Sequence, residues 1–146
     1  LIAGGGNSLH YHHSFSEKFE ALEGDLGVQA GKQKKELRRG ESYTVTSGVI
    51  HKFYNETDKT IKFNVELRPG HKGFENCIQI GYGLAKDGLT NKNGIPKKFS
   101  HLAVLLALGD TNLPGIYTML TSILLWRAAR ARKNGTEREL IEKYCK

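Results

Sequence analysis

The sequence has few of the residues that point to a disulfide-bonded or zinc-ribbon protein. Its 146 residues include two cysteines, Cys77 and Cys145, which lie far apart and form no CxxC pair. We therefore expect neither a disulfide framework nor a thiolate metal site, and a reducing, cytoplasmic setting fits best. The first residues also lack a charged region followed by a signal-type apolar stretch, so we expect no targeting segment in them.

A long uninterrupted apolar run is lacking as well. Residues 102–126 carry one charge, Asp110, but the polar and Gly/Pro-containing stretch 109–115 divides them into two pieces. Each piece is shorter than the roughly 20 residues that a membrane span needs. We expect a helical hairpin that packs on the rest of the chain or on a partner subunit, in preference to attachment at a membrane surface.

Positive charge is in excess, with a formal net charge of +7. It gathers in two clusters, at residues 32–39 and at residues 127–133. Nucleic-acid binding surfaces usually interleave aromatic side chains with such cations, and these clusters do not. We interpret both as solvated faces and expect no nucleic-acid partner.

The chain divides into a strand-rich half and a helix-rich half. Alternation and turn residues predict strands at 18–22, 26–30, 35–39, 42–46, 49–54 and 61–67. After Gly70 the apolar period changes and predicts helices near 74–87, 99–108 and 114–133. A capping box of Thr136 and Glu139 predicts a last helix. We expect a mainly β protein, with a β domain over residues 1–70 and a helical extension over residues 71–146 that packs on this domain or on a dimer partner.

His10, His12 and Glu17 form the first part of a candidate metal site. In a strand, His10 and His12 point to the same face about 7 Å apart, so two imidazoles can bind one ion. A carboxylate from the next strand, Glu17, can supply a third ligand. Glu17 is also the one residue that we name as a tentative catalytic group.

His51 is the fourth candidate ligand. By strand alternation it shares a face with Val49 and Phe53, which places it toward the same cavity. Three histidines and one glutamate leave about two positions open on a six-coordinate ion, for water, dioxygen or a bidentate substrate.

The spacing of these residues matches two motifs. Gly4, His10, His12, Glu17 and Gly24 fit G(X)5HXH(X)3-4E(X)6G, and Gly40, Thr46, Gly48, His51 and Asn55 fit G(X)5PXG(X)2H(X)3N with Thr46 in place of Pro. The chain thus resembles the cupin superfamily, in particular small single-domain cupins of the conserved-barrel type with a C-terminal helical extension. The resemblance implies a jelly-roll-like β-barrel. Such barrels normally have one or two strands before the first motif, and we expect these strands to be absent, to lie outside the given residues or to be supplied by a partner.

The resemblance gives less guidance on the reaction. It implies one divalent ion, Fe, Mn, Ni, Zn or Cu, and a small-molecule ligand or substrate. A metal-dependent dioxygenase is the leading hypothesis, followed by an isomerase or lyase. The alternative is a non-catalytic small-ligand-binding or storage protein. Because cupin barrels commonly pair and the apolar helices need covering, we also expect a homodimer.

Overall fold

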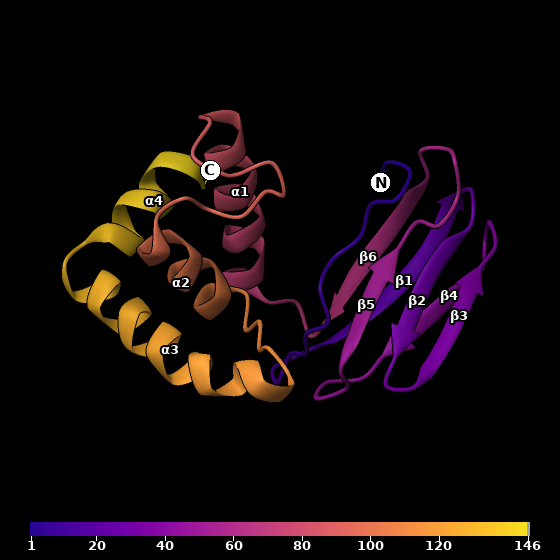
Figure 1. The fold of residues 1–146 in the computed structure, drawn as a ribbon, viewed down its shortest axis with the longest axis horizontal. Coiled ribbons are helices and arrows are strands. Elements are labelled where there is room, and N and C mark those ends of the chain that lie inside the picture. The colour runs from indigo at the N-terminus through magenta and orange to yellow at the C-terminus, as the bar shows by residue number, and fades with distance from the viewer. Residues whose placement is uncertain (146) are drawn as a thin grey trace. The chain divides into compact units, whose positions relative to one another are not determined.

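The computed structural model describes residues 1–145 and divides the chain into two compact units, residues 1–71 and residues from 72 onward (Figure 1). We call them the β unit and the helical unit, and each is described by itself.

The β unit contains two antiparallel sheets of three strands. The strands are β1 (Ser16–Glu23), β2 (Leu26–Ala30), β3 (Gln33–Leu37), β4 (Ser42–Val45), β5 (His51–Tyr54) and β6 (Lys62–Arg68), in the orders β4-β1-β6 and β3-β2-β5. Period-two burial is clearest in β1, where Glu17, Phe19 and Ala21 are buried and the residues between them are partly exposed. This alternation aims one face of each strand at a common core.

The core of the β unit is shared by both sheets. Phe19 and Ala21 of β1 and Val45 of β4 pack in one cluster with apolar residues of β2 and β3. Packing two inner faces against each other is how antiparallel sheets bury their apolar side chains. The two sheets are therefore held together mainly by side chains.

The segment before β1 runs along β5 without forming a regular strand. His10 and His51 exchange backbone hydrogen bonds of 3.0 and 2.8 Å, and Asn7 N–H donates to the Phe53 carbonyl at 3.2 Å. The Asn7 side chain continues this ladder, because its Oδ1 accepts the Phe53 N–H at 2.8 Å. Residues 4–12 thus form an irregular extension of the β3-β2-β5 sheet.

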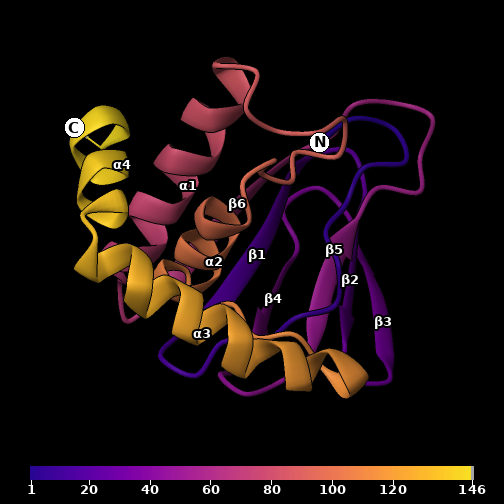
Figure 2. The same ribbon diagram turned by 60° about the vertical axis from the view of Figure 1, so that its left-hand side comes forward.

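The helical unit contains α1 (Lys72–Lys86), α2 (Phe99–Leu108), the 3-10 turn η1 (Gly115–Tyr117), α3 (Thr118–Lys133) and α4 (Thr136–Tyr144) (Figure 2). Ile80 and Leu84, one turn apart on α1, pack with Val104, Ala131 and Leu140 in a single apolar core. At the end of α1, Asp87 accepts hydrogen bonds of 2.7 Å from Lys143 Nζ and from the Tyr144 hydroxyl, which ties α4 to α1.

The fold differs from the sequence-based expectation in two respects. The sheets of the β unit do not join into a closed barrel. Helices account for 36% of the chain and strands for 27%, so the prediction of a mainly β protein describes the β unit and not the whole chain. Among the described residues, no helix combines the length and apolarity that a membrane span requires.

Candidate metal centre

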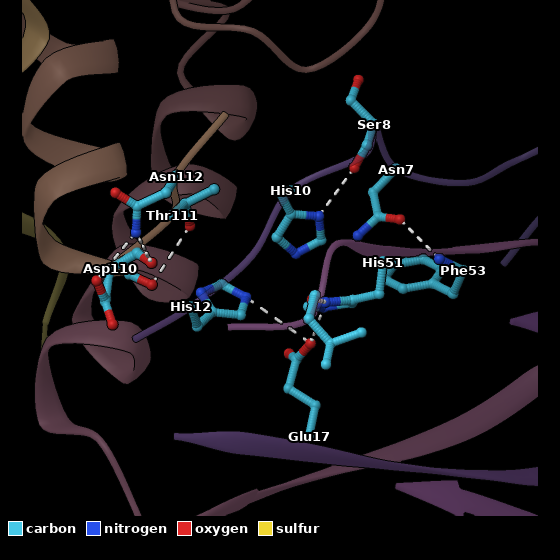
Figure 3. Close-up of polar contacts among 12 residues, drawn as sticks. Asn7, Ser8, His10, His12, Glu17, His51, Phe53, Asp110, Thr111 and Asn112 are labelled. Carbon is cyan, nitrogen blue, oxygen red and sulfur yellow. Dashed lines mark hydrogen bonds and ion pairs between the residues drawn. The ribbon is translucent and has the colours of Figure 1, made fainter. Parts of the chain in front are cut away.

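Four residues that are far apart in the sequence meet inside the β unit. His10, His12, Glu17 and His51 are buried, with exposed fractions of 8, 2, 5 and 2%. One ligand atom from each lies within 4.8 Å of the corresponding atoms of the others. Figure 3 shows the imidazoles of His10, His12 and His51 and the carboxylate of Glu17 converging on one region. We call these four residues the His/Glu cluster.

Strand pairing explains why the side chains converge. His10 and His51 stand directly opposite each other in the ladder, and their ring centroids lie 4.4 Å apart. His12 is two residues further and shares the face of His10, with a centroid separation of 4.8 Å. Glu17 reaches the cluster from β1, on the other sheet, so the site spans the space between the sheets.

Two backbone carbonyls set the protonation of two imidazoles. His10 Nδ1–H donates to the Ser8 carbonyl and His51 Nδ1–H donates to the Val49 carbonyl, both at 2.8 Å. A carbonyl can only accept, so Nδ1 carries the proton in each ring. The neutral form of each imidazole therefore offers the Nε2 lone pair, and hydrogen bonds of this kind orient histidine ligands in metal sites.

The carboxylate of Glu17 is shared between two imidazoles. Its Oε2 lies 2.6 Å from His51 Nε2 and 3.7 Å from His12 Nε2. Glu17 Oε2 therefore lies at hydrogen-bonding distance from one imidazole nitrogen and within 4 Å of a second. A metal cation held by the cluster would be bound by Glu17 together with these two imidazoles.

The donor set fits a divalent ion. Metal bonds of about 2.0–2.2 Å place two donors of one ion at most about 4.4 Å apart. The ligand atoms of the cluster lie up to 4.8 Å apart, so they need to move by only about half an ångström to bind one ion. Imidazole and carboxylate donors suit Fe, Mn, Ni, Zn and Cu, which leaves the identity of the ion open. The cluster is thus compatible with one bound metal ion.

Burial also keeps one donor in its metal-binding form. Desolvation lowers the pKa of His10 from 6.5 to about 4, and the neighbouring imidazoles of His51 and His12 act in the same direction. His10 is consequently neutral at physiological pH, with its Nε2 lone pair available.

Some supporting residues were not found from the sequence. Phe15 is buried and its ring stacks on His12, with centroids 4.4 Å apart and an interplanar angle of 27°. Asn7 supports His10 through its side-chain bond to β5. A phenylalanine between HxH and Glu17 is the only signal that could have pointed to Phe15.

Asn55, the last residue of the second motif, fixes the backbone around the site. Its Nδ2 donates to the carbonyls of Leu1, Ile2 and Lys59 at 2.8–3.1 Å, and its Oδ1 accepts from the Thr57 backbone N–H and hydroxyl. The side chain is 1% exposed. Asn55 thus orders the turn after β5 and anchors the segment that leads to His10.

A known protein family matches the part of the chain that contains the His/Glu cluster. Residues 1–67 match the family model of the cupin domain. The β unit is a cupin domain. No curated protein matches the sequence.

Several solved structures are similar to this chain, and each similarity covers less than half of it. A sugar phosphate isomerase of the cupin superfamily from Silicibacter pomeroyi is 29% identical, with a TM-score of 0.41, covering 44% of this chain and 43% of that protein. A predicted oxalate decarboxylase from Thermotoga maritima is 21% identical, with a TM-score of 0.44 and coverages of 46 and 58%. A cupin 2 conserved barrel domain protein from Salinispora arenicola is 19% identical, with a TM-score of 0.42 and coverages of 46 and 56%. The match spans about half the length of these proteins.

Proposed function

We propose that the cupin domain binds one divalent metal ion through the His/Glu cluster and acts as a metal-dependent enzyme on a small organic molecule. The observation that carries this proposal is the burial of three imidazoles and one carboxylate around a single point. Burying such groups costs stability unless their polar atoms are used, and perturbed, buried titratable groups concentrate at functional sites.

The number of donors favours a particular class of reaction. Four protein ligands leave about two positions on a six-coordinate ion, enough for a co-substrate and a substrate, and oxygenation is therefore our first choice. A bound ion would supply Lewis-acid polarisation of a substrate oxygen or, with a redox-active metal, electron transfer. Isomerisation or a lyase reaction, which need only the Lewis acid, come second.

Glu17 has a second role in this proposal. It contributes the only carboxylate of the cluster, and its Oε2 lies 2.6 Å from His51 Nε2. If it leaves the ion, the same carboxylate could accept a proton from a substrate and return it. The three imidazoles, two of them oriented by backbone carbonyls, then act as fixed donors that hold the ion.

One observation favours the non-catalytic alternative. No member of the cluster is more than 8% exposed, so the described conformation offers a substrate little access. A binding or storage cupin that holds a metal with a very small ligand would need no more access than this. The experiment below separates the two functions.

The test compares metal-free protein with protein reloaded separately with Fe(II), Mn(II), Ni(II), Zn(II) or Cu(II). Oxygen uptake and product formation are followed over a panel of enolic and phenolic compounds, in air and under nitrogen. A dioxygenase consumes oxygen only with a redox metal, whereas an isomerase or lyase turns over under nitrogen and with Zn(II). Metal binding without turnover of any compound would support the non-catalytic alternative.

Glu17→Gln has a matched control on the same strand. Glu20 lies on β1 and is partly exposed, three residues from Glu17. Glu17→Gln should abolish turnover and weaken metal binding, whereas Glu20→Gln should change neither. Equal effects of the two substitutions would contradict the role given to Glu17.

A further inference from the structure

Helix α3 exposes large apolar side chains opposite its packed face. Leu124, Ala128 and Ala131 are buried and face the helical unit. Met119, Ile123 and Trp126 recur at helical spacing on the opposite face, with exposed fractions of 83, 52 and 59%. Arg130 and Lys133, both exposed, continue the same line toward the end of the helix. We call these five residues the α3 stripe.

The charge around the stripe has one sign. Between Asp110 and Glu137 the sequence has no acidic residue and has four basic ones, all between residues 127 and 133. The whole helical unit carries twelve Lys and Arg against six Asp and Glu. Helix α3 itself therefore carries only positive charge, which complements an anionic partner.

Apolar and basic side chains are separated along the helix axis. At 1.5 Å per residue, Met119 to Trp126 covers about 10 Å, and Trp126 to Lys133 covers about another 10 Å. Amphipathic elements at membrane interfaces bury apolar groups about 5–10 Å deep, with cations at the headgroups.

Aromatic side chains stand at the boundary between the two halves. The guanidinium carbon of Arg127 lies 5.9 Å from the ring centroids of both Trp126 and Phe99, and Phe99 is itself 47% exposed. Tryptophan prefers the level of lipid headgroups, where an apolar ring and a polar edge are both accommodated. Its position next to the first arginine is the one expected at an interface.

We propose that the α3 stripe docks the protein on an anionic lipid membrane surface. Met119 and Ile123 enter the boundary between headgroups and acyl chains, Trp126 lies at the headgroup level, and Arg130 and Lys133 contact lipid phosphates. A second copy of this chain would bring the same basic surface and no negative complement. A nucleic acid would complement the charge but not the exposed Met119 and Ile123. This proposal is independent of the metal site.

Trp126 provides a direct test because it is the only tryptophan of the chain. The full-length protein is titrated with vesicles of phosphatidylcholine alone and with vesicles containing 30% phosphatidylglycerol. We expect a blue shift of tryptophan emission, and quenching by acyl-chain bromines, with the anionic vesicles only. Emission that stays unchanged with both kinds of vesicle would overturn the proposal.

Variants distinguish docking from non-specific adsorption. Met119→Ser with Ile123→Ser should abolish sedimentation with anionic vesicles, whereas Tyr82→Ser, which replaces a 74% exposed residue of α1, should not. Arg130→Gln with Lys133→Gln should weaken binding roughly thirtyfold, and 0.5 M salt should do the same. Lys32→Gln with Lys34→Gln in the cupin domain should have little effect.

Three results would contradict the proposal. Vesicle binding that survives Met119→Ser with Ile123→Ser would mean electrostatic adsorption alone. Trp126 emission that depends on protein concentration without lipid would mean that a second copy covers the stripe. Salt-dependent binding to RNA or DNA, unaffected by the apolar substitutions and unmatched by vesicles, would assign the basic surface to nucleic acid.

Discussion

The cupin domain buries polar side chains, whereas the helical unit exposes apolar ones. Within the described residues, the cupin domain buries His10, His12, Glu17, His51 and Asn55, while α3 alone has five large apolar side chains more than 40% exposed. Buried polar groups and exposed apolar patches are the two informative departures from ordinary burial. The first carries our proposal of a metal site, and the second carries our proposal of a docking surface.

The two departures differ in how specific they are. A buried imidazole needs a particular partner atom, such as the Ser8 carbonyl for His10, so its position along the chain is narrowly fixed. An exposed apolar helix face needs only enough apolar surface area to contact a partner, and many different sequences provide such an area. For this reason the cupin domain can be recognised from a motif with fixed spacing. The helical unit can be recognised only from its content of apolar and basic residues.

Acidification should produce the largest contrast between the units. The pKa of His10 is about 4 in the folded protein and about 6.5 when unfolded, so between these values only the unfolded state binds the proton. Stability is therefore complete above pH 6.5 and falls by about 3 kcal/mol as the pH drops to 4. Urea unfolding of metal-free protein at pH 7 and pH 4.5, followed by circular dichroism of the strands, measures this loss.

His10→Asn is the control for this experiment, because it keeps a polar side chain that does not titrate. Its cupin domain should lose most of the pH dependence. The helical unit has one counterpart, His101, whose pKa burial also lowers, with a smaller contribution from Lys98. Its transition, followed by Trp126 fluorescence, should shift in the same direction and by less. A larger loss of stability on acidification in the helical unit than in the cupin domain would contradict this expectation.

Substitutions of two glycines on α1 should change the stability of the helical unit and leave the cupin domain unaffected. A Cβ at Gly83 would collide with the Tyr144 ring, whereas a Cβ at Gly81 meets only Leu105 Cδ1 at 3.9 Å. Gly83→Ala should destabilise the helical unit by about 1–3 kcal/mol, because α4 must move away. Gly81→Ala should stabilise it by about 0.5–1 kcal/mol through helix propensity.

Thermal unfolding monitored by Trp126 fluorescence checks both substitutions. Metal binding by the cupin domain should be the same in Gly83→Ala, Gly81→Ala and the unsubstituted protein. Loss of metal binding in Gly83→Ala, or equal effects of the two substitutions on unfolding, would disagree with the separate cores described here.

A smaller effect is expected at Asn7, which supports His10 from outside the cluster. Asn7→Ala removes the acceptor of the Phe53 N–H and should weaken metal binding about tenfold, within the range found for groups that orient ligands. Asn7→Asp keeps an acceptor at this position and should restore most of the affinity. Competition against a coloured chelator measures both. Equal losses in the two variants would exclude a positioning role.

The sequence was sufficient to predict which side chains meet in the cluster. Strand alternation aimed His51 correctly, and the Gly31-Lys32 turn joins β2 and β3 as expected. The sequence was not sufficient to predict that His10 lies on an irregular segment and not on a regular strand. There, the Asn7 side chain replaces a backbone acceptor, which no alternation pattern reveals.

One further expectation was wrong and another was confirmed only in part, both for identifiable reasons. The predicted capping box fails because Thr136 is the first residue of α4, after Gly135, and its hydroxyl hydrogen-bonds to Asn134 Oδ1. The predicted cupin barrel is supported, but its two sheets are not closed, because closure depends on pairing between distant strands, which local alternation does not encode. Local patterns thus predicted elements and facing side chains, and they failed on caps and on non-local pairing.

The metal stoichiometry of the cluster tests the central claim most directly. Metal-free protein is titrated with Co(II), whose absorption reports coordination, and the bound metal is counted by elemental analysis. We predict that one ion binds per chain, and that binding is lost in His51→Ala but retained in His71→Ala. Binding of no metal, or stoichiometric binding that persists in His51→Ala, would contradict the assignment.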